Sequence, residues 1–333
     1  MAAAMARVLY VHSRRNTFTA IDREALSERY EVVDYFQPRL RVRPLELFRK
    51  LRRSDVVFGW FASWHTFAAL TLARLMRKPS VLVIGGFDVA NMPEIGYGAQ
   101  RGGPRRWMTR RTIAIATRLI TNSRYSLREI EANLGLGPDR VTLVYHGIPD
   151  RFGDRPGASK DDLALTVGVV YRANLERKGH SAFVAAAGLV PEVEFVLAGK
   201  WQDDAAEELR AAAAPNVNLT GFISDAELDA LFRRAGAYVQ PSRHEGFGLA
   251  VAEAMLARCV PVVTDAGALL EVVGDTGVVI PSPDPEHVAN GVREALALGA
   301  EAGERARARV LAEFSYEMRR DGICGVVEQA LSP

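Results

Sequence analysis

Short apolar runs recur along the chain, and segments of helical periodicity separate them. The runs are four to eight residues long and rich in Val, Ile and Leu, which is typical of parallel strands buried on both faces. The segments between them predict helices, for example over residues 203–214, 225–235 and 247–258. Six runs lie in each half, at residues 7–11, 31–35, 56–61, 80–85, 118–121 and 141–145, then 163–170, 193–199, 216–221, 236–242, 260–264 and 276–281.

This alternation predicts βαβ units, and therefore parallel sheets covered by helices, the α/β fold class. The break between the two halves is expected at residues 148–162, IPDRFGDRPGASKDD, where two prolines, two glycines and mixed charge are typical of a linker. A length of 333 residues also fits two domains. Ligands of doubly wound α/β domains bind at the carboxyl ends of the strands, so two facing domains would enclose a cleft.

Composition narrows the class of protein. The chain is 48% hydrophobic and 25% charged, as expected for an ordinary globular protein. Its two cysteines, Cys259 and Cys324, make neither a disulfide framework nor a zinc signature, so we expect a reducing cytoplasm.

Residues 56–73 are uncharged over about the length of a membrane span, but their polar positions favour a buried strand, a turn and a helix. We expect no signal peptide at the N-terminus.

The stretch PSRHEGFGLAVAEAM, residues 241–255, carries the clearest candidate chemistry. It predicts a loop after a strand and then a helix from about Phe247. Gly246 and Gly248 flank the helix start, where bare backbone amides can bind a diphosphate. Glu245 and Glu253 are placed to bind hydroxyl groups beside that site. The alternative is a packing helix with a glycine-rich start and a solvated Glu253, and composition alone does not separate the two interpretations.

A second candidate is TVGVVYRANLERKGH, residues 166–180, where a strand ends at Gly168 and a helix follows a basic loop. Arg172, Arg177 and Lys178 in this loop could neutralise a phosphate as it leaves. The alternative is a solvated basic loop.

The frame E-G-F-G-L-x-x-x-E-A-M, with two glutamates at positions 245 and 253, resembles the signature of retaining family-4 glycosyltransferases of the GT-B fold. The resemblance is strong over residues 163–318, moderate over residues 80–150 and thin over residues 1–55. It implies two doubly wound Rossmann-like domains facing each other across a cleft. Residues 1–150 would form the acceptor-side domain, residues 151–314 the nucleotide-sugar donor domain, and a helix at about 315–333 would pack back on the first domain.

The resemblance also implies roles for individual residues. Glu253 would hold the donor ribose, Glu245 would contact the transferred sugar, and the amides of Gly246, Phe247, Gly248 and Leu249 would receive the phosphates. Arg172 and Lys178, six residues apart, match the family's cationic pair, but whether Arg172 or Arg177 partners Lys178 stays open.

Three weaker assignments complete the predicted site. Phe222 and Ile223 resemble the segment that borders the base, and the Ser242 hydroxyl could bind phosphate, although local turn chemistry accounts for both equally well. Asp88, in GGFDV at residues 85–89, resembles the aspartate of the family's His-Gly-x-Asp segment, with Gly85 in the histidine position. It would contact donor sugar or acceptor, or else cap its own loop. The predicted catalytic set is thus Asp88, Arg172, Lys178 and Glu245.

The function that the resemblance implies is transfer of a hexosyl group from a UDP- or GDP-type donor, with retention and without a metal or other cofactor. The acceptor is unidentified, whether a lipid-linked molecule, a glycan or a small molecule. Two alternatives are a nucleotide-sugar-binding protein without transferase activity and a GT-B nucleotide-sugar epimerase. An NAD-linked oxidoreductase is disfavoured because no G-x-G-x-x-G follows the first strand.

Charge is divided unequally between the halves. Residues 1–150 hold 24 Lys and Arg against 13 Asp and Glu, whereas residues 151–333 hold 18 against 27. Two basic segments, residues 38–55 and 102–111, carry apolar residues that could serve as membrane anchors: Leu47, Phe48, Leu51, Trp107 and Met108. We therefore expect a cytoplasmic protein whose first half can dock on an anionic surface, either the inner face of the membrane or a phosphate-bearing acceptor. The alternative is a solvated arginine-rich surface, and nucleic acid is not an expected partner.

Overall fold

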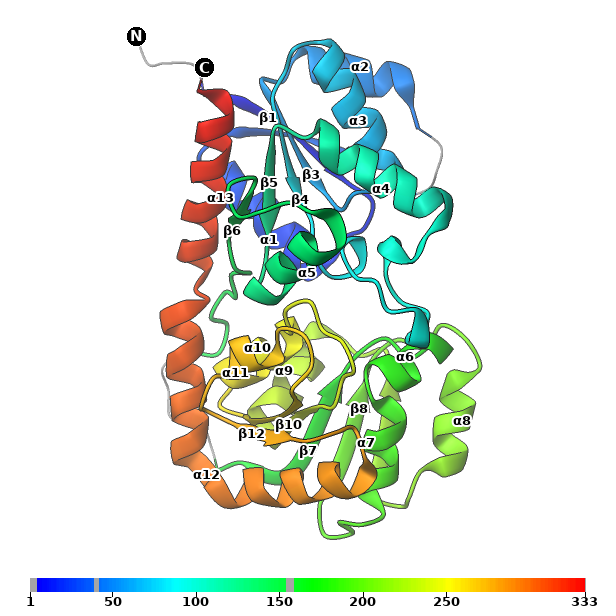
Figure 1. The fold of residues 1–333 in the computed structure, drawn as a ribbon. Coiled ribbons are helices and arrows are strands. Elements are labelled where there is room, and N and C mark those ends of the chain that lie inside the picture. Colours follow the sequence, from blue (N-terminus) through cyan, green and yellow to red (C-terminus); the bar gives the residue numbers. More distant parts are fainter. Residues whose placement is uncertain (1–4, 39–41, 154–158, 333) are drawn as a thin grey trace. The chain divides into compact units, whose positions relative to one another are not determined.

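The structure is a computed structural model that describes residues 5–38, 42–153 and 159–332 (Figure 1). The chain divides into two compact units. The first unit comprises Met1–Gly147 together with Ser315–Pro333, and the second comprises Ile148–Phe314. Both are α/β units built on a six-stranded parallel sheet.

The sheet of the first unit has the strand order β2-β1-β3-β4-β5-β6, and each neighbouring pair is parallel. Each strand coincides with one of the six apolar runs of the first half, so these six predictions are confirmed. The strands are β1 (Arg7–His12), β2 (Glu31–Phe36), β3 (Val56–Trp60), β4 (Ser80–Val83), β5 (Arg118–Thr121) and β6 (Val141–Leu143).

Helices cover both faces of this sheet, and each face buries its own hydrophobic core. One core lies under four helices, α2 (Pro44–Arg52), α3 (Trp64–Leu75), α4 (Gly103–Ile115) and α5 (Arg124–Leu134). The other core lies under α1 (Thr17–Ser27) and α13 (Tyr316–Leu331). The strand and helix predicted over residues 56–73 are thus present as β3 and α3. Among the described residues, no helix is long and apolar enough to cross a membrane.

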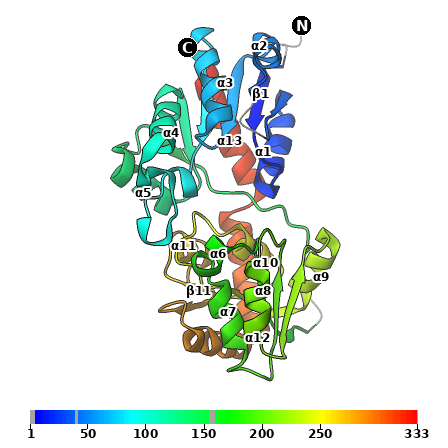
Figure 2. The same ribbon diagram turned by 90° about the vertical axis from the view of Figure 1, so that its right-hand side faces the viewer.

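Helix α13 follows the whole second unit in sequence but belongs to the first unit (Figures 1 and 2). Ile323, Cys324 and Val327 pack into the core that α1 also covers. The Arg319 guanidinium makes a buried ion pair with Asp22 of α1, with 2.6 Å between Nη2 and Oδ2. Arg319 also donates to the carbonyl of Val144, 2.7 Å away, so one buried cation joins α13 to α1 and to the end of β6.

The sheet of the second unit has the order β12-β11-β10-β7-β8-β9, again all parallel. Its strands confirm the six apolar runs of the second half. They are β7 (Asp161–Val167), β8 (Glu194–Ala198), β9 (Val217–Gly221), β10 (Ala235–Gln240), β11 (Val260–Thr264) and β12 (Val278–Ile280).

The helices of the second unit are α6 (Arg172–Arg177), α7 (His180–Ala187), α8 (Ala205–Ala212), α9 (Asp225–Arg234), α10 (Leu249–Leu256), α11 (Leu269–Val273) and α12 (Pro285–Glu313). Helices α7, α8 and α12 bury their apolar sides in one large core against the sheet. The strand order reverses between β7 and β10, which are hydrogen-bonded neighbours. Such a reversal is where open α/β sheets bind ligands, at the carboxyl ends of the strands.

The apolar anchors predicted for membrane contact need a correction. Leu47, Leu51 and Met108 are buried in the first unit, with at most 3% of their surface exposed. Leu47 and Leu51 belong to the core under α2, because their helical spacing puts them on the side of α2 that faces the sheet. Phe48 and Trp107 are exposed, as the prediction requires. Arg39 and Arg41 lie outside the described residues.

Candidate functional site

Two loops meet where the strand order of the second sheet reverses. The loop after β7 leads through α6 to Lys178 and Gly179, and the loop after β10 begins at Pro241. Gly179 has φ of 73°, and a Cβ added there would lie 2.1 Å from the carbonyl oxygen of Pro241. Only glycine fits both the left-handed backbone and this close approach. The Arg243 amide donates to the carbonyl of Arg177 at 2.8 Å, which joins the loops further.

This junction brings Lys178 and Glu245 together, and they form an ion pair. Both side chains are largely buried, with 19% and 16% of their surface exposed. Burial alone would raise the pKa of Glu245, but the charges of Lys178 and Arg177 outweigh it and lower that pKa. Glu245 is therefore ionised at neutral pH, and a negatively charged ligand would compete with it for Lys178.

The structure favours Arg177 over Arg172 as the second cation beside Lys178. Arg177 lies against the loop after β10, where its guanidinium hydrogen-bonds to Asn174 and to the His244 carbonyl, with 3.4 Å between Nη1 and that oxygen. Arg172 instead is exposed and pairs with Asp204 and Glu208 near α8, at 2.9 Å in each case. The place of Arg172 in the catalytic set stays a prediction, because in this structure its guanidinium pairs with two exposed acidic residues.

The helix of the predicted diphosphate site begins later than the sequence suggested. Helix α10 starts at Leu249, not near Phe247, and Gly248 precedes it with φ of 105°, a backbone conformation that favours glycine. The Phe247 side chain is buried and packs against Phe314, with ring centroids 5.3 Å apart. Gly246 to Leu249 therefore form a tight turn into α10. The adjacent Glu245 backbone is clamped by the Ala268 amide, which donates to the Glu245 carbonyl at 2.8 Å.

Glu253 lies further along α10 and contacts a residue that the sequence did not indicate. Arg151, in the segment before β7, places its Nη1 3.4 Å from Glu253 Oε1 and its Nε 2.6 Å from Asp229 Oδ1. Burial raises the pKa of Glu253, and the charge of Arg151 opposes that rise. No sequence signal singled out Arg151, because it stands in the predicted linker.

Of the weaker candidates in the second unit, Phe222 and Ile223 are accessible and Ser242 is not. Phe222 is 80% exposed at the end of β9, and Ile223 is partly buried. Ser242 is fully buried, its Oγ accepts a hydrogen bond from Gln240 at 2.7 Å, and its carbonyl accepts one from Thr264. The prediction that the Ser242 hydroxyl faces a phosphate is therefore corrected, because that hydroxyl fixes the turn after β10.

Asp88 lies in the first unit and is 4% exposed. Its carboxylate accepts a hydrogen bond from the Ala62 amide at 3.1 Å, and burial raises its pKa to about 7. This corrects the expectation that Asp88 points into a ligand site, since it holds two loops together instead. At the neighbouring Gly85, an added Cβ would lie 2.8 Å from Asn122 Oδ1, so Asn122 fills the space beside the position where the family pattern has histidine.

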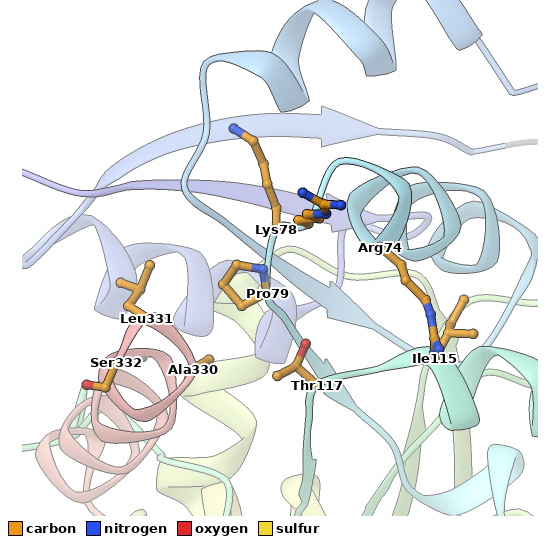
Figure 3. Close-up of a pocket in the computed structure, with 9 residues that line it drawn as sticks. Arg74, Lys78, Pro79, Ile115, Thr117, Ala330, Leu331 and Ser332 are labelled. Carbon is orange, nitrogen blue, oxygen red and sulfur yellow. The ribbon is translucent and has the colours of Figure 1, made fainter.

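Elsewhere in the first unit, Figure 3 shows a cavity of about 470 Å³ between α3, the end of α4 and the end of α13. Arg74, Lys78 and Leu331 are among the residues that line it, and none of the predicted site residues does. Among the described residues we find no group of three His, Cys, Asp or Glu side chains that could hold a metal ion.

Sequence comparison identifies the same class for both units. Residues 155–310 match the profile of the glycosyl transferases group 1, and residues 8–152 match that of glycosyltransferase family 4. The chain is 30% identical over 217 residues to a lipopolysaccharide core biosynthesis mannosyltransferase of Rhizobium leguminosarum, which covers 57% of this chain and 60% of that protein. It is 32% identical over 287 residues to a glycogen synthase of Mycobacterium tuberculosis, covering 80% of this chain and 66% of that one. The chain thus matches less than two thirds of either relative.

The fold agrees with these matches. Anabaena HepE, solved in complex with UDP and glucose, superposes with a TM-score of 0.74 and 16% identity, covering 97% of this chain and 99% of that one. The fold and the two profiles together identify the class of protein as the GT-B glycosyltransferases. This chain belongs to the glycosyltransferases that combine a family-4 region, here residues 8–152, with a following group-1 region, here residues 155–310.

Proposed function

We propose that this protein transfers a sugar from a nucleoside diphosphate donor to an acceptor and releases the nucleoside diphosphate. The observation that carries the proposal is the cluster of Lys178, Arg177, Glu245 and the turn into α10 at one point of the second sheet. The family relationship supports the same reaction class, since one relative named above is a mannosyltransferase and the other a glycogen synthase by name.

The diphosphate would bind at the turn into α10, between the amides of Gly246 to Leu249 and the cations of Lys178 and Arg177. The aligned amides at a helix start favour an anion, and cations stabilise charge that develops on the leaving phosphate. Lys178 would then exchange its partner, from Glu245 to the phosphate. This frees Glu245 to accept hydroxyl groups of the transferred sugar. Because these groups supply the positive charge, we expect turnover without a divalent metal.

The nucleoside would lie towards Glu253 and the end of β9. Glu253 would accept the ribose hydroxyls, and the exposed Phe222 with Ile223 would border the base. The donor is of the UDP or GDP type. UDP bound to HepE is the precedent for a UDP-type donor, and the Rhizobium mannosyltransferase is the precedent for a mannosyl group. The first unit would bind the acceptor, and glycan biosynthesis with retention of anomeric configuration is the pathway class and stereochemistry that we propose from the family.

The test uses the full chain. Thermal-shift measurements with UDP, GDP, ADP and TDP and their sugars select the donor, and mass spectrometry of reactions with candidate acceptors identifies the product. We expect one nucleoside diphosphate to bind more tightly than its nucleoside, and EDTA to leave turnover intact. Equal affinity for nucleoside and nucleoside diphosphate would exclude the phosphate site. Donor turnover to an epimer with no glycosylated product would favour an epimerase instead.

We also propose that the first unit attaches to an anionic membrane through the outer surface of α2, α3 and α4, here called the α2–α4 face. Of the described exposed large hydrophobic side chains in this unit, most lie on these three helices: Leu45, Phe48, Trp64, Leu75 and Trp107. Trp64 and Trp107 both contact Phe67, with centroids 6.5 Å and 6.0 Å apart, so α3 and α4 share one aromatic surface.

The charges on this face suit an anionic leaflet. Exposed arginines border the aromatic surface, at positions 49, 52, 74, 105, 106, 110 and 111. The only acidic residue of the three helices is Glu46, which pairs with Arg43 and Lys50. A basic residue near an anionic leaflet contributes about 1 kcal/mol, so four engaged arginines give reversible attachment that weakens with salt.

Sedimentation with vesicles tests the attachment. We expect the protein to pellet at low salt with phosphatidylglycerol vesicles and not with phosphatidylcholine vesicles. The double variant Trp64→Ser, Trp107→Ser should stay in the supernatant, whereas Met318→Ser on α13, which removes an exposed apolar side chain elsewhere, should pellet normally. A wild-type protein that fails to pellet with anionic vesicles at low salt contradicts the proposal.

A further inference from the structure

Arg151 occupies an unusual place at the nucleoside end of the proposed donor site. Its backbone belongs to the segment that enters the second unit, yet its guanidinium reaches between α9 and α10. There it donates to Asp229 at 2.6 Å and lies 3.4 Å from Glu253. The guanidinium also lies over the rings of Phe152 and Phe232, 5.1 Å and 5.8 Å from the two centroids. These contacts hold the Arg151 guanidinium in one orientation.

Glu253 needs such a cation. Its side chain is only 14% exposed, and a carboxylate in that environment tends to take up a proton. Two further carboxylates face it from α9, Asp229 and Asp225, and both raise the pKa of Glu253. Tyr238 of β10 is a buried phenol near Glu253, and the charge of Glu253 contributes to raising the pKa of Tyr238. Arg151 is the cation that lowers the pKa of Glu253.

We infer that Arg151 is a positioning residue for donor binding, which keeps Glu253 ionised and oriented so that it accepts the ribose hydroxyls. Asp229 anchors Arg151 through the shorter contact, so the longer contact to Glu253 is the one that can lengthen when ribose arrives. This inference rests on the proposed function, because it takes Glu253 as the ribose ligand.

The chemistry behind the inference concerns the protonation state of one carboxyl group. An ionised carboxylate accepts hydrogen bonds at both oxygens, whereas a protonated one keeps a proton on one of them. An ionised Glu253 can therefore accept one ribose hydroxyl at each oxygen, and these charge-assisted hydrogen bonds are stronger than those to a protonated carboxyl. Without Arg151, the pKa of Glu253 rises further, and the affinity for the nucleotide then falls more steeply towards low pH than it does in the wild type.

The experiment measures affinity as a function of pH by calorimetry, from pH 5.5 to pH 8.5, with the full chain and with UDP or GDP, whichever the wild type binds. For Arg151→Gln we expect at least a tenfold loss of affinity at the acidic end that recovers as the pH rises. Arg151→Lys, which keeps the charge, should restore most of the affinity at low pH. Arg233→Gln is the matched control, because Arg233 neighbours the same segment and contacts the carbonyls of Arg151 and Phe152 but no carboxylate in the described contacts.

The outcomes separate this inference from the proposed function. If the wild type binds no nucleoside diphosphate at any pH, the proposed donor site itself is wrong. If the wild type binds and Arg151→Gln loses affinity equally at every pH, or not at all, the donor site stands and the role of Arg151 is wrong. A pH-dependent loss in Arg233→Gln of the same size also overturns the inference, because the effect would then follow from disturbance of the segment.

Discussion

At the carboxyl edge of the second sheet, Lys178 and Glu245 form an ion pair that joins two loops. At the same edge of the first sheet, Asp88 and His65 are buried and bonded to the backbone. Burial raises the pKa of Asp88 to about 7 and lowers that of His65 to about 4, so His65 is neutral at pH 7 and Asp88 holds its proton below that pH. Two sheets of one architecture thus use their polar groups differently: the second joins two charged side chains across loops, and the first buries polar groups against its backbone.

The difference shows that the position of a residue in an α/β fold does not by itself decide its role. A polar residue after a parallel strand can serve a ligand or fasten a loop. The deciding property is whether its partners leave it exposed to exchange. At this edge the second unit pairs Lys178 with Glu245 across two loops, and the first unit bonds Asp88 and His65 to backbone groups. The predictions below test this contrast from the largest expected effect to the smallest.

Arg319→Met should destabilise the first unit by about 3–5 kcal/mol, because it leaves Asp22 as an unpaired buried charge. Denaturant unfolding followed by tryptophan fluorescence reports mainly on this unit, since Trp60, Trp64 and Trp107 all lie in it. Arg320→Met is the control, as Arg320 makes only exposed pairs with Glu28 and Asp321. Equal unfolding midpoints for the two variants would show that the buried pair does not fasten this unit.

Lys178→Met should lower turnover by about 100- to 1,000-fold, the loss typical when one preorganised group that stabilises developing charge is removed. Affinity for the free nucleoside should stay unchanged, because the nucleoside carries no phosphate. Arg172→Met should have little effect on either quantity, because the wild-type Arg172 guanidinium pairs with Asp204 and Glu208. The assignment of Arg177 as the second cation fails if the Arg172 variant loses as much turnover as the Lys178 variant.

Glu253→Ala should weaken binding of the nucleoside diphosphate by about 1.5–3 kcal/mol, the value of hydrogen bonds to a charged group. Glu245→Ala should leave that binding nearly intact and reduce turnover or affinity for the sugar donor instead. Titration calorimetry with the nucleoside diphosphate and with its sugar distinguishes the two. The reverse pattern would exchange the roles of the two glutamates.

Asp88→Asn tests whether the buried Asp88 carboxyl holds a proton in the folded first unit, and the measured quantity is the free energy of unfolding as a function of pH. The folded-state pKa of Asp88 is about 7 and the unfolded value is near 4, so between these values the folded state holds a proton that the unfolded state has released. Stability therefore falls as pH rises through this window, by about 1.4 kcal/mol per pH unit. Asn keeps an oxygen for the Ala62 amide and cannot ionise, so the slope between pH 5 and pH 6 should be shallower in the variant. Parallel slopes would mean that Asp88 is charged in the folded protein.

Much of the fold could be predicted because buried parallel strands leave a strong signal in sequence. All twelve apolar runs became strands, and residues 56–73 became a strand and a helix. The start of α10 was placed too early, because the left-handed backbone of Gly248 delays the helix. Leu47 and Leu51 of α2 were wrongly predicted as membrane anchors. Their helical spacing marks an apolar face of the helix without telling whether that face meets the sheet or a membrane.

The candidate site was harder to predict, because side-chain partners far apart in sequence decide it. Arg172 and Arg177 are equivalent in a motif, and only the acidic residues near α8 separate them. Ser242 stands three residues from Glu245, yet its hydroxyl turns inward to Gln240. Arg151 gave no signal, since its partner Glu253 lies about a hundred residues away. The sequence could show which residue types are present, but not which contacts use them.

The position of α13 has a consequence for the order in which the protein folds as it is synthesised. The first unit leaves the ribosome before the second, but the face of its sheet that α1 and α13 share lacks α13 until the second unit has been made. Apolar residues of that face, such as Val8, Val81 and Val83, then depend on α1 alone. The second unit is continuous in sequence and can fold as soon as it emerges. A helix translated after the whole second unit therefore completes the core of the first unit, and a nascent chain that stalls before Ser315 exposes an unfinished core to chaperones and proteases.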